Sequence, residues 1–183
     1  IGLFVYDTVT EKELTADQYK LLKFYKLNTK RELSDFRLAS GDEVYSNQNL
    51  QDQWNLIFMG FASCPDMCPM TMSQIAKTSD LLKAESPELL KNITFTIISV
   101  DPDRDSPSKI LKYAQAFNED FIGVSGAIEE IYKLATNLTL PFVPVLNSTE
   151  NNYDMDHSMN LALISPDGNC LLYTSPSPRD IGE

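Results

Sequence analysis

The chain has 183 residues, a formal net charge of −11, and a composition of 43% hydrophobic and 22% charged residues. This composition is typical of a folded domain with its own core, and the acidic balance argues against nucleic acid or an anionic membrane surface as a partner. Three cysteines are too few for a disulfide-scaffold protein, and no apolar run is long enough to span a bilayer.

The first part of the chain, residues 1–33, is expected to form an arm beside the main domain. It opens with the apolar segment IGLFVYD, which is either a trimmed end or the exit of a membrane anchor whose upstream part is missing. Residues 10–32 are predicted to form a polar helix, because Leu14, Tyr19 and Leu22 give a narrow apolar stripe at helical spacing.

From residue 34 to residue 173, strand and helix patterns alternate, with a hairpin at each end. The hairpins turn at Gly41-Asp42 and at 166–169, where glycine and aspartate separate two β-type runs. The other predicted strands are 54–59, 93–101 and 121–126, and the predicted helices are 68–86, 107–117 and 127–138. This order predicts an α/β fold with a mixed central sheet flanked by helices.

Two stretches lack such patterns. Residues 139–156 contain Pro141 and Pro144 and are predicted to form one long polar loop, a type of loop that is often functional. Residues 174–183, ending in SPSPRDIGE, have no apolar periodicity, so we expect them to be unstructured or an artefact of sequence assembly.

A pair of cysteines, Cys64 and Cys68, lies where the predicted strand 54–59 passes into a helix. A helix start favours negative charge, so we expect thiolates with a lowered pKa at this point. The two Cβ atoms should be roughly 5–6 Å apart, one helical turn. The pair can therefore bind one soft metal ion, act as a redox pair or form a structural disulfide; two inert thiols are the alternative.

The only histidine, His157, lies where the predicted loop passes into the strand 159–165. A lone histidine is often a filler of the core or surface, but this position also suits a ligand. Its neighbour Asp156 could orient the ring, although a solvated carboxylate is the simpler interpretation. The acidic segment 101–105 is expected to serve in turns and helix capping, with Asp101 or Asp105 as an electrostatic neighbour of the site.

The segments GFASCPDMCP, ISVDPDRD and DHSMNLALISPDG occur in this order. Together they resemble the Sco/SenC family of thioredoxin-fold copper proteins, which help to assemble cytochrome c oxidase. The likeness covers residues 34–173 and implies a thioredoxin-like fold with copper ligands at Cys64, Cys68 and His157. It also implies a location at the mitochondrial inner membrane, facing the intermembrane space, or in a bacterial periplasm.

Two thiolates and one imidazole form a soft three-coordinate site that selects Cu(I) over hard cations. We therefore expect a copper-binding assembly factor that delivers copper to a cytochrome c oxidase subunit, or keeps the cysteines of that subunit reduced, and that exchanges copper with other chaperones. We do not expect a metallochaperone of this kind to be an enzyme, apart from a thiol-disulfide reductase activity of its cysteine pair. The alternatives are a metal-free thiol-disulfide oxidoreductase using Cys64 and Cys68, and a structural subunit of a respiratory complex.

Several other sulfur atoms lie near these residues in the sequence. Met67, Met70 and Met155 could offer transient ligands for copper, whereas Met72 and Met159 are expected to pack in the core.

The third cysteine, Cys170, follows the second hairpin turn and is expected to pack as a small hydrophobe. A structural zinc site would instead combine Cys170 with Cys64, Cys68 and His157.

Overall fold

The computed structural model describes residues 15, 17, 18, 24–146 and 153–174. Its centre is a six-stranded mixed sheet with the strand order β1-β10-β9-β4-β5-β6. The pairs β4–β5 and β5–β6 are parallel, and the remaining pairs are antiparallel. In that order the strands are β1 (Phe24–Glu32), β10 (Asn169–Thr174), β9 (Leu161–Ile164), β4 (Trp54–Gly60), β5 (Ile93–Ser99) and β6 (Ile122–Val124).

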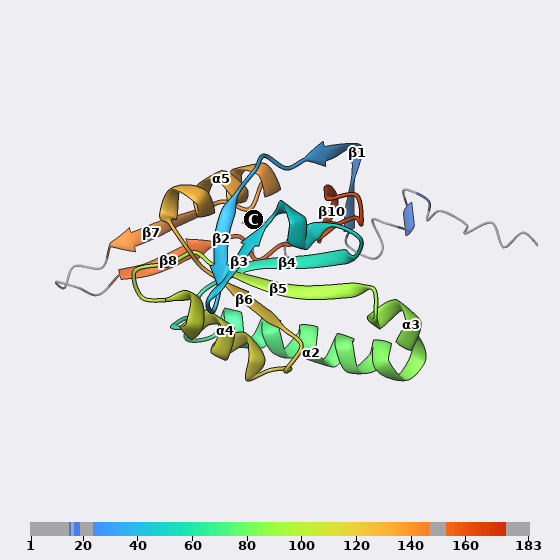
Figure 1. The fold of residues 1–183 in the computed structure, drawn as a ribbon, viewed down its shortest axis with the longest axis horizontal. Coiled ribbons are helices and arrows are strands. Elements are labelled where there is room, and N and C mark those ends of the chain that lie inside the picture. The colour runs from blue at the N-terminus through green and yellow to red at the C-terminus, as the bar shows by residue number, and fades with distance from the viewer. Residues whose placement is uncertain (1–14, 16, 19–23, 147–152, 175–183) are drawn as a thin grey trace, which may run out of the picture.

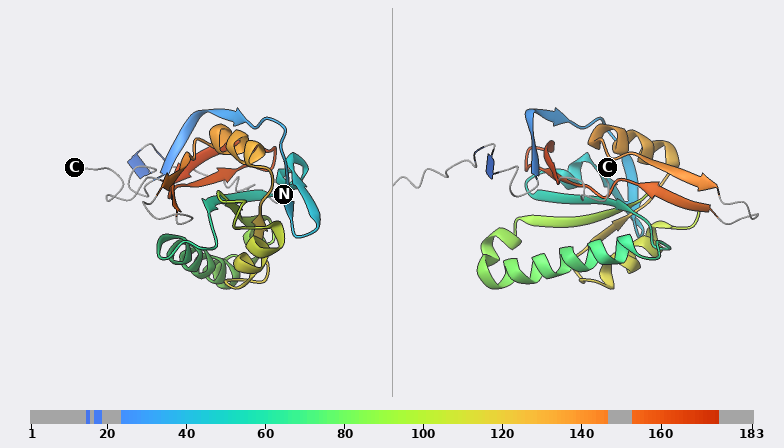
Figure 2. Two further views of the ribbon diagram at one scale, coloured as in Figure 1. Left: turned by 90° about the vertical axis from the view of Figure 1, so that its left-hand side faces the viewer. Right: turned by 180° about the vertical axis from the view of Figure 1, so that it is seen from behind.

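Helices cover both faces of this sheet (Figure 1). The helices α2 (Met67–Glu85) and α4 (Pro107–Gln115) lie on one side, and α5 (Ile128–Leu138) lies on the other, as the end-on view in Figure 2 also shows. The short helix α3 (Pro87–Leu90) follows α2 after the expected break at Ser86-Pro87. The predicted α/β architecture is therefore confirmed.

The central strands β4 and β5 are buried along most of their length. Ile57, Ile97 and Ile98 are fully buried, as expected of strands that helices cover on both faces. The helix α4 starts as predicted, because the Ser106 side chain accepts a hydrogen bond from the Lys109 amide and Pro107 occupies the first turn. These elements fix the carboxyl end of β4, where the cysteine pair begins.

The predicted first hairpin is present as β2 (Arg37–Ser40) and β3 (Glu43–Ser46), and it is followed by the short 3-10 helix η1 (Asn47–Leu50). Gly41 lies at the turn with φ +58, a conformation that favours glycine. The hairpin is joined to the region after β6 by backbone hydrogen bonds between Ala39 and Ser125.

The helix predicted for residues 10–32 is wrong over its second half. Residues Phe24–Glu32 form β1, which pairs antiparallel with β10 at the edge of the sheet. Residues 24–32 form a strand despite their weak helical pattern, because the open edge of β10 offers backbone hydrogen bonds along its length. Arg31 strengthens this attachment by donating from Nη1 to the Asn137 carbonyl over 3.1 Å. Residues 1–14 of the expected arm lie outside the described part.

The single long loop predicted for residues 139–156 is also wrong. Residues Phe142–Leu146 form β7 and residues Tyr153–His157 form β8, and the two strands pair antiparallel as a separate two-stranded sheet. Prolines suggested a loop, but an edge strand tolerates proline where its missing N–H is not needed. This hairpin places His157 opposite Phe142.

The expected tail lies almost wholly outside the described residues, since the description ends at Thr174 in β10. None of the helices in the described part has the length and hydropathy needed to cross a bilayer.

Candidate metal centre

The proposed ligands come from three elements that meet beside the carboxyl end of β4. Cys64 lies in the segment that connects β4 to α2, and Cys68 lies in the first turn of α2. His157 is the last residue of β8. The residues were singled out from the sequence, and the structure brings all three together.

The three ligand atoms form a compact triangle. The Sγ atoms of Cys64 and Cys68 and one ring nitrogen of His157 all lie within 4.8 Å of one another. The distance from Cys68 Sγ to His157 Nε2 is 3.4 Å. Metal bonds of about 2.0–2.3 Å to sulfur and imidazole nitrogen give trigonal ligand atoms about 4 Å apart. One ion therefore fits between the three groups with only small adjustments.

The sulfur of Cys64 takes the place of a helix cap. The side chain of Asp66, the residue before α2, makes no capping hydrogen bond. Instead, the amide of Cys68 donates to Cys64 Sγ over 3.3 Å. This contact satisfies a backbone N–H group of the first helical turn and holds the Cys64 sulfur beside Cys68.

Cys68 departs from the expectation that both thiols would have a lowered pKa. Its side chain is fully buried, and this burial raises the pKa of the Cys68 thiol well above its ordinary value. Desolvation therefore outweighs the helix start. In the metal-free protein this thiol stays protonated at neutral pH, and a bound metal ion must displace the proton. The three cysteines are free thiols in the structure.

The imidazole of His157 is held in a defined orientation. Its Nδ1 atom lies 3.2 Å from the carbonyl oxygen of Ser158, so an Nδ1–H group donates there and leaves the Nε2 lone pair facing the sulfurs. The rings of Phe58 and Phe61 lie edge-on to it at 5.8 Å. Burial lowers the pKa of His157 below its ordinary value, which favours the neutral form that binds metals.

Gly60 lies at the end of β4, and because it has no side chain the Cys68 sulfur can pack against its backbone. A Cβ atom at this position would lie 3.0 Å from Cys68 Sγ and 2.8 Å from the ring of Phe58. Both distances are shorter than ordinary contacts, so a larger residue would push the sulfur or the ring away.

Asp105 forms hydrogen bonds that hold the backbone segment leading to Cys64. This fully buried carboxylate accepts hydrogen bonds from the Ala62 amide at 2.7 Å and from Ser99 Oγ at 3.0 Å. Lys109 Nζ lies 3.0 Å from its other oxygen and balances the charge. The residue expected to be a turn former or an electrostatic neighbour thus positions the backbone that leads to Cys64.

A second network ties the histidine hairpin to the domain. Asp101 forms an ion pair with Arg104 and accepts a hydrogen bond from the Tyr153 hydroxyl at 2.7 Å. Arg104 also donates to the Tyr153 carbonyl over 3.0 Å, and its guanidinium lies 4.2 Å from the centre of the Tyr153 ring. Sequence reasoning missed Arg104 and Tyr153, because nothing in the local pattern links positions 49 to 52 residues apart.

The other residues considered from the sequence, Asp103, Asp156 and Cys170, do not belong to the ligand group. Asp156 and Asp103 are exposed, and Ser158 rather than Asp156 contacts the ring of His157. Cys170 is buried in β10, as expected for a small hydrophobe. It is absent from the metal-capable group found within the described ranges, so the four-ligand zinc set is not assembled there.

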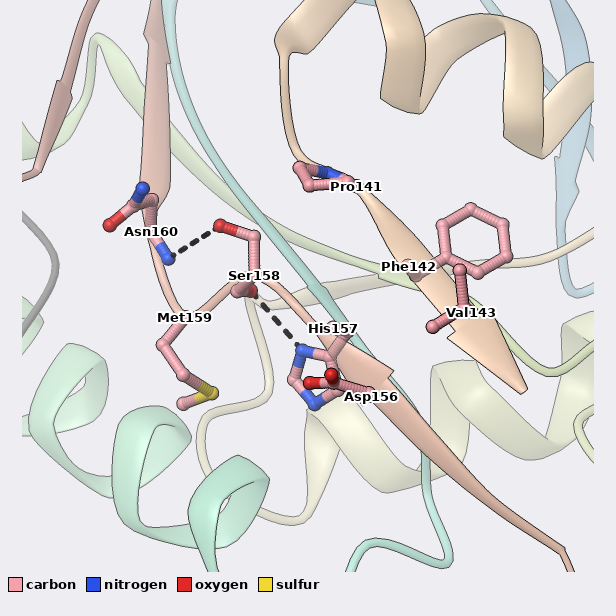
Figure 3. Close-up of a pocket in the computed structure, with 8 residues that line it drawn as sticks. All are labelled: Pro141, Phe142, Val143, Asp156, His157, Ser158, Met159 and Asn160. Atoms are coloured by element: carbon pink, nitrogen blue, oxygen red, sulfur yellow. Dashed lines mark hydrogen bonds between the residues drawn. The ribbon is translucent and has the colours of Figure 1, made fainter. Parts of the chain in front are cut away.

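The site opens to solvent through two pockets that share His157 and Met159. One, of about 440 Å3, also contacts Cys64. The other, of about 340 Å3, lies along the β7–β8 hairpin and is drawn in Figure 3. The ligands are therefore accessible from outside, although Cys68 itself is buried.

Comparison with known proteins identifies the family. The SCO1/SenC family model matches residues 26–180. The chain belongs to the SCO1/SenC family. The match extends beyond the expected 34–173 and includes most of β1, in agreement with the pairing of that strand to the central sheet.

Two SCO1/SenC relatives show how much of the chain is shared. A protein of Stutzerimonas stutzeri named for copper binding is 39% identical over 69% of this chain and 60% of its own length. The mitochondrial SCO1 homolog of Homo sapiens is 32% identical over 75% of this chain and 45% of its own length. The chain thus spans about half of these two relatives.

A solved SCO1/SenC structure supports the same fold. The crystal structure of Arabidopsis thaliana ScoI with copper bound is 29% identical and has a TM-score of 0.70, covering 78% of this chain and 86% of that chain. The thioredoxin-like fold expected from the sequence is therefore confirmed.

Proposed function

We propose that this SCO1/SenC chain binds copper through Cys64, Cys68 and His157 and delivers it to a copper-binding subunit of cytochrome c oxidase. The observation that carries this proposal is the convergence of two thiols and a neutral imidazole within 4.8 Å. The likeness to a relative solved with copper bound supports the choice of metal.

The donor set favours Cu(I) as cargo. Thiolate and imidazole are soft or borderline ligands, and no carboxylate belongs to the group of three found in the described ranges. Cys64 is half-buried and lines the pocket to the outside, whereas Cys68 is buried. A three-coordinate ion reached from this pocket can pass to an incoming thiolate by ligand exchange.

Partners and location follow from the same proposal. The relatives include mitochondrial proteins and bacterial ones, so we place the chain at the mitochondrial inner membrane, facing the intermembrane space, or in a bacterial periplasm. Its partners would be other copper chaperones and the copper-binding oxidase subunit.

The test is anaerobic titration with Cu(I) in competition with a chromogenic chelator. Cys64→Ser, Cys68→Ser and His157→Ala should each lower the affinity by at least about tenfold, a magnitude seen when metal sites lose supporting contacts. Cys170→Ala is the matched control and should retain wild-type affinity. Equal affinity in His157→Ala and wild type would overturn the three-ligand site.

A thiol-disulfide oxidoreductase is the second candidate, favoured by the hydrogen bond from the Cys68 amide to Cys64 Sγ. Cys64 is also the more accessible of the two cysteines, as an attacking thiol requires. Reduction of a disulfide-bonded oxidase-subunit peptide by His157→Ala at the wild-type rate, together with no measurable copper affinity in the wild type, would favour this candidate.

A further inference from the structure

Three methionines face the same pocket as the metal ligands. The pocket of about 440 Å3 is lined by Met67, Met155 and Met159 together with Cys64 and His157. Met67 lies in the first turn of α2 next to Cys68, and the other two flank His157 in the sequence. Thioethers from two separate elements therefore converge where the site meets solvent.

Met155, His157 and Met159 line this pocket from one segment of the chain. Met155 and His157, two residues apart in β8, point to the same face of that strand, and Met159 follows two residues after the strand ends. Figure 3 shows the side chains of His157 and Met159 pointing to the same side of the segment, with the Ser158 side chain directed away from them. Asp154 and Asp156, the alternate residues of β8, are exposed.

The other two methionines of this region are arranged differently. Met70 is 55% exposed on α2 and does not line the pocket, whereas Met72 is buried in the core. The structure therefore changes the expected grouping: Met159 joins the candidates for transient ligation, and Met70 leaves them. Met67 is 41% exposed, so its thioether can be reached from solvent.

The chemistry of the pocket suits a monovalent soft cation. A thioether is a neutral soft donor and has no proton to release, so it can hold Cu(I) weakly without any change in protonation. Asp66, Asp154 and Asp156 also line the pocket, and its described lining contains no lysine or arginine. These carboxylates attract a cation to the pocket, and none of them belongs to the group of three metal-capable side chains in the described ranges.

We propose that Met67, Met155 and Met159 form an entry site that holds Cu(I) before it reaches Cys64, Cys68 and His157. This inference rests on the proposed copper-binding function. Each copper–thioether bond breaks as a bond to a cysteine sulfur or to His157 Nε2 forms, any proton on a thiol that binds passes to solvent, and copper remains Cu(I) throughout. The thioethers thus govern the rate of loading, while the three final ligands govern affinity.

The test separates the rate of loading from affinity. Stopped-flow mixing of the apo protein with the Cu(I) complex of bicinchoninate should show loading about tenfold slower in Met67→Leu/Met159→Leu than in wild type. The affinity at equilibrium should stay within about twofold, because methionine-to-leucine changes conserve volume. Met70→Leu is the matched control on the same helix and should load at the wild-type rate.

Wild-type loading in the double variant would overturn the entry site and leave the proposed function standing. An equal slowing in Met70→Leu would also overturn it. If the wild type bound no Cu(I) at equilibrium, the proposed function and the entry site would both be wrong.

Direct binding can be measured with Ag(I), a redox-inert substitute for Cu(I). In Cys64→Ser/Cys68→Ser with carbon-13-labelled methionine methyl groups, Ag(I) should shift the NMR signals of Met67, Met155 and Met159. The Met70 and Met72 signals serve as internal controls and should stay in place. Unchanged signals from all five methionines would contradict the entry site.

Discussion

The Nε2 atom of His157 lies 3.4 Å from Sγ of Cys68, although 89 positions separate the two residues. The contact joins the helix α2 to the separate β7–β8 sheet. Cys68 belongs to a helix that follows the central sheet, whereas His157 belongs to the separate β7–β8 pair. Contacts between these two parts therefore determine whether the ligand set is complete.

Copper affinity should rise with pH. Burial raises the pKa of the Cys68 thiol and lowers the pKa of His157, so near neutral pH the thiol carries a proton and the imidazole does not. Binding at Cys68 releases that proton, which should tighten the affinity by about tenfold per pH unit for each proton released. Chelator competition at several pH values measures this slope. A flat profile in wild type, or an unchanged slope in Cys68→Ser, would contradict the explanation.

Replacing Asp105 with Ala should destabilise the fold and weaken the site. The Ala62 amide would lose its acceptor, and an unsatisfied buried donor costs about 1–3 kcal/mol. We expect the free energy of unfolding to fall by that amount in urea, with a lower Cu(I) affinity because the segment leading to Cys64 relaxes. The exposed Asp103→Ala is the control, and a similar loss in that variant would show that the effect is not specific to the buried carboxylate.

Replacing Tyr153 with Phe should loosen the histidine hairpin without disturbing the cysteines. The variant removes the hydroxyl that donates to Asp101 and keeps the ring under Arg104. The expected loss of stability is about 1–2 kcal/mol, typical of a hydrogen bond to a charged group, with faster release of Cu(I) to a chelator. Tyr132→Phe, which retains the ring stacked on Phe142, should release copper at the wild-type rate. Equal release rates in all three proteins would mean that the Tyr153 hydroxyl does not hold the hairpin.

Replacing Gly60 with Ala should displace the sulfur of Cys68. The added methyl group would lie 3.0 Å from that sulfur, and overpacking of this kind costs about 1–3 kcal/mol. Thermal unfolding and Cu(I) competition should both report a loss. Wild-type affinity together with lowered stability would mean that the Phe58 ring, rather than the sulfur, gives way.

Much of the fold could be predicted because local patterns and tertiary structure agree. The run around Ile57 is apolar, the run around Ile97 is rich in β-branched residues, and α4 begins at a serine–proline pair. The same agreement explains why the strand-to-helix junction at Cys64 and Cys68 was found. His157 could be assigned to the site only through the resemblance, since its spacing from the cysteines carries no local signal.

The errors occur where long-range pairing decides the structure. Residues 24–32 have a weak helical stripe, yet they pair with β10 because that edge supplies backbone partners. Pro144 suggested a loop, but it lies in β7 opposite Met155. The raised pKa of Cys68 was missed because burial of a side chain depends on neighbours that its own segment does not specify.

The position of the β7–β8 hairpin would determine whether a bound ion has two ligands or three. The sulfurs of Cys64 and Cys68 lie at the junction of β4 and α2. The imidazole of His157 belongs instead to the β7–β8 hairpin, which the Tyr153 and Arg104 contacts hold to the rest of the domain. Val143 and Val145 in β7 are exposed, so this hairpin presents apolar side chains to solvent. Under the proposed function, a displacement of this hairpin would withdraw the imidazole and leave a bound ion with only the two sulfur ligands.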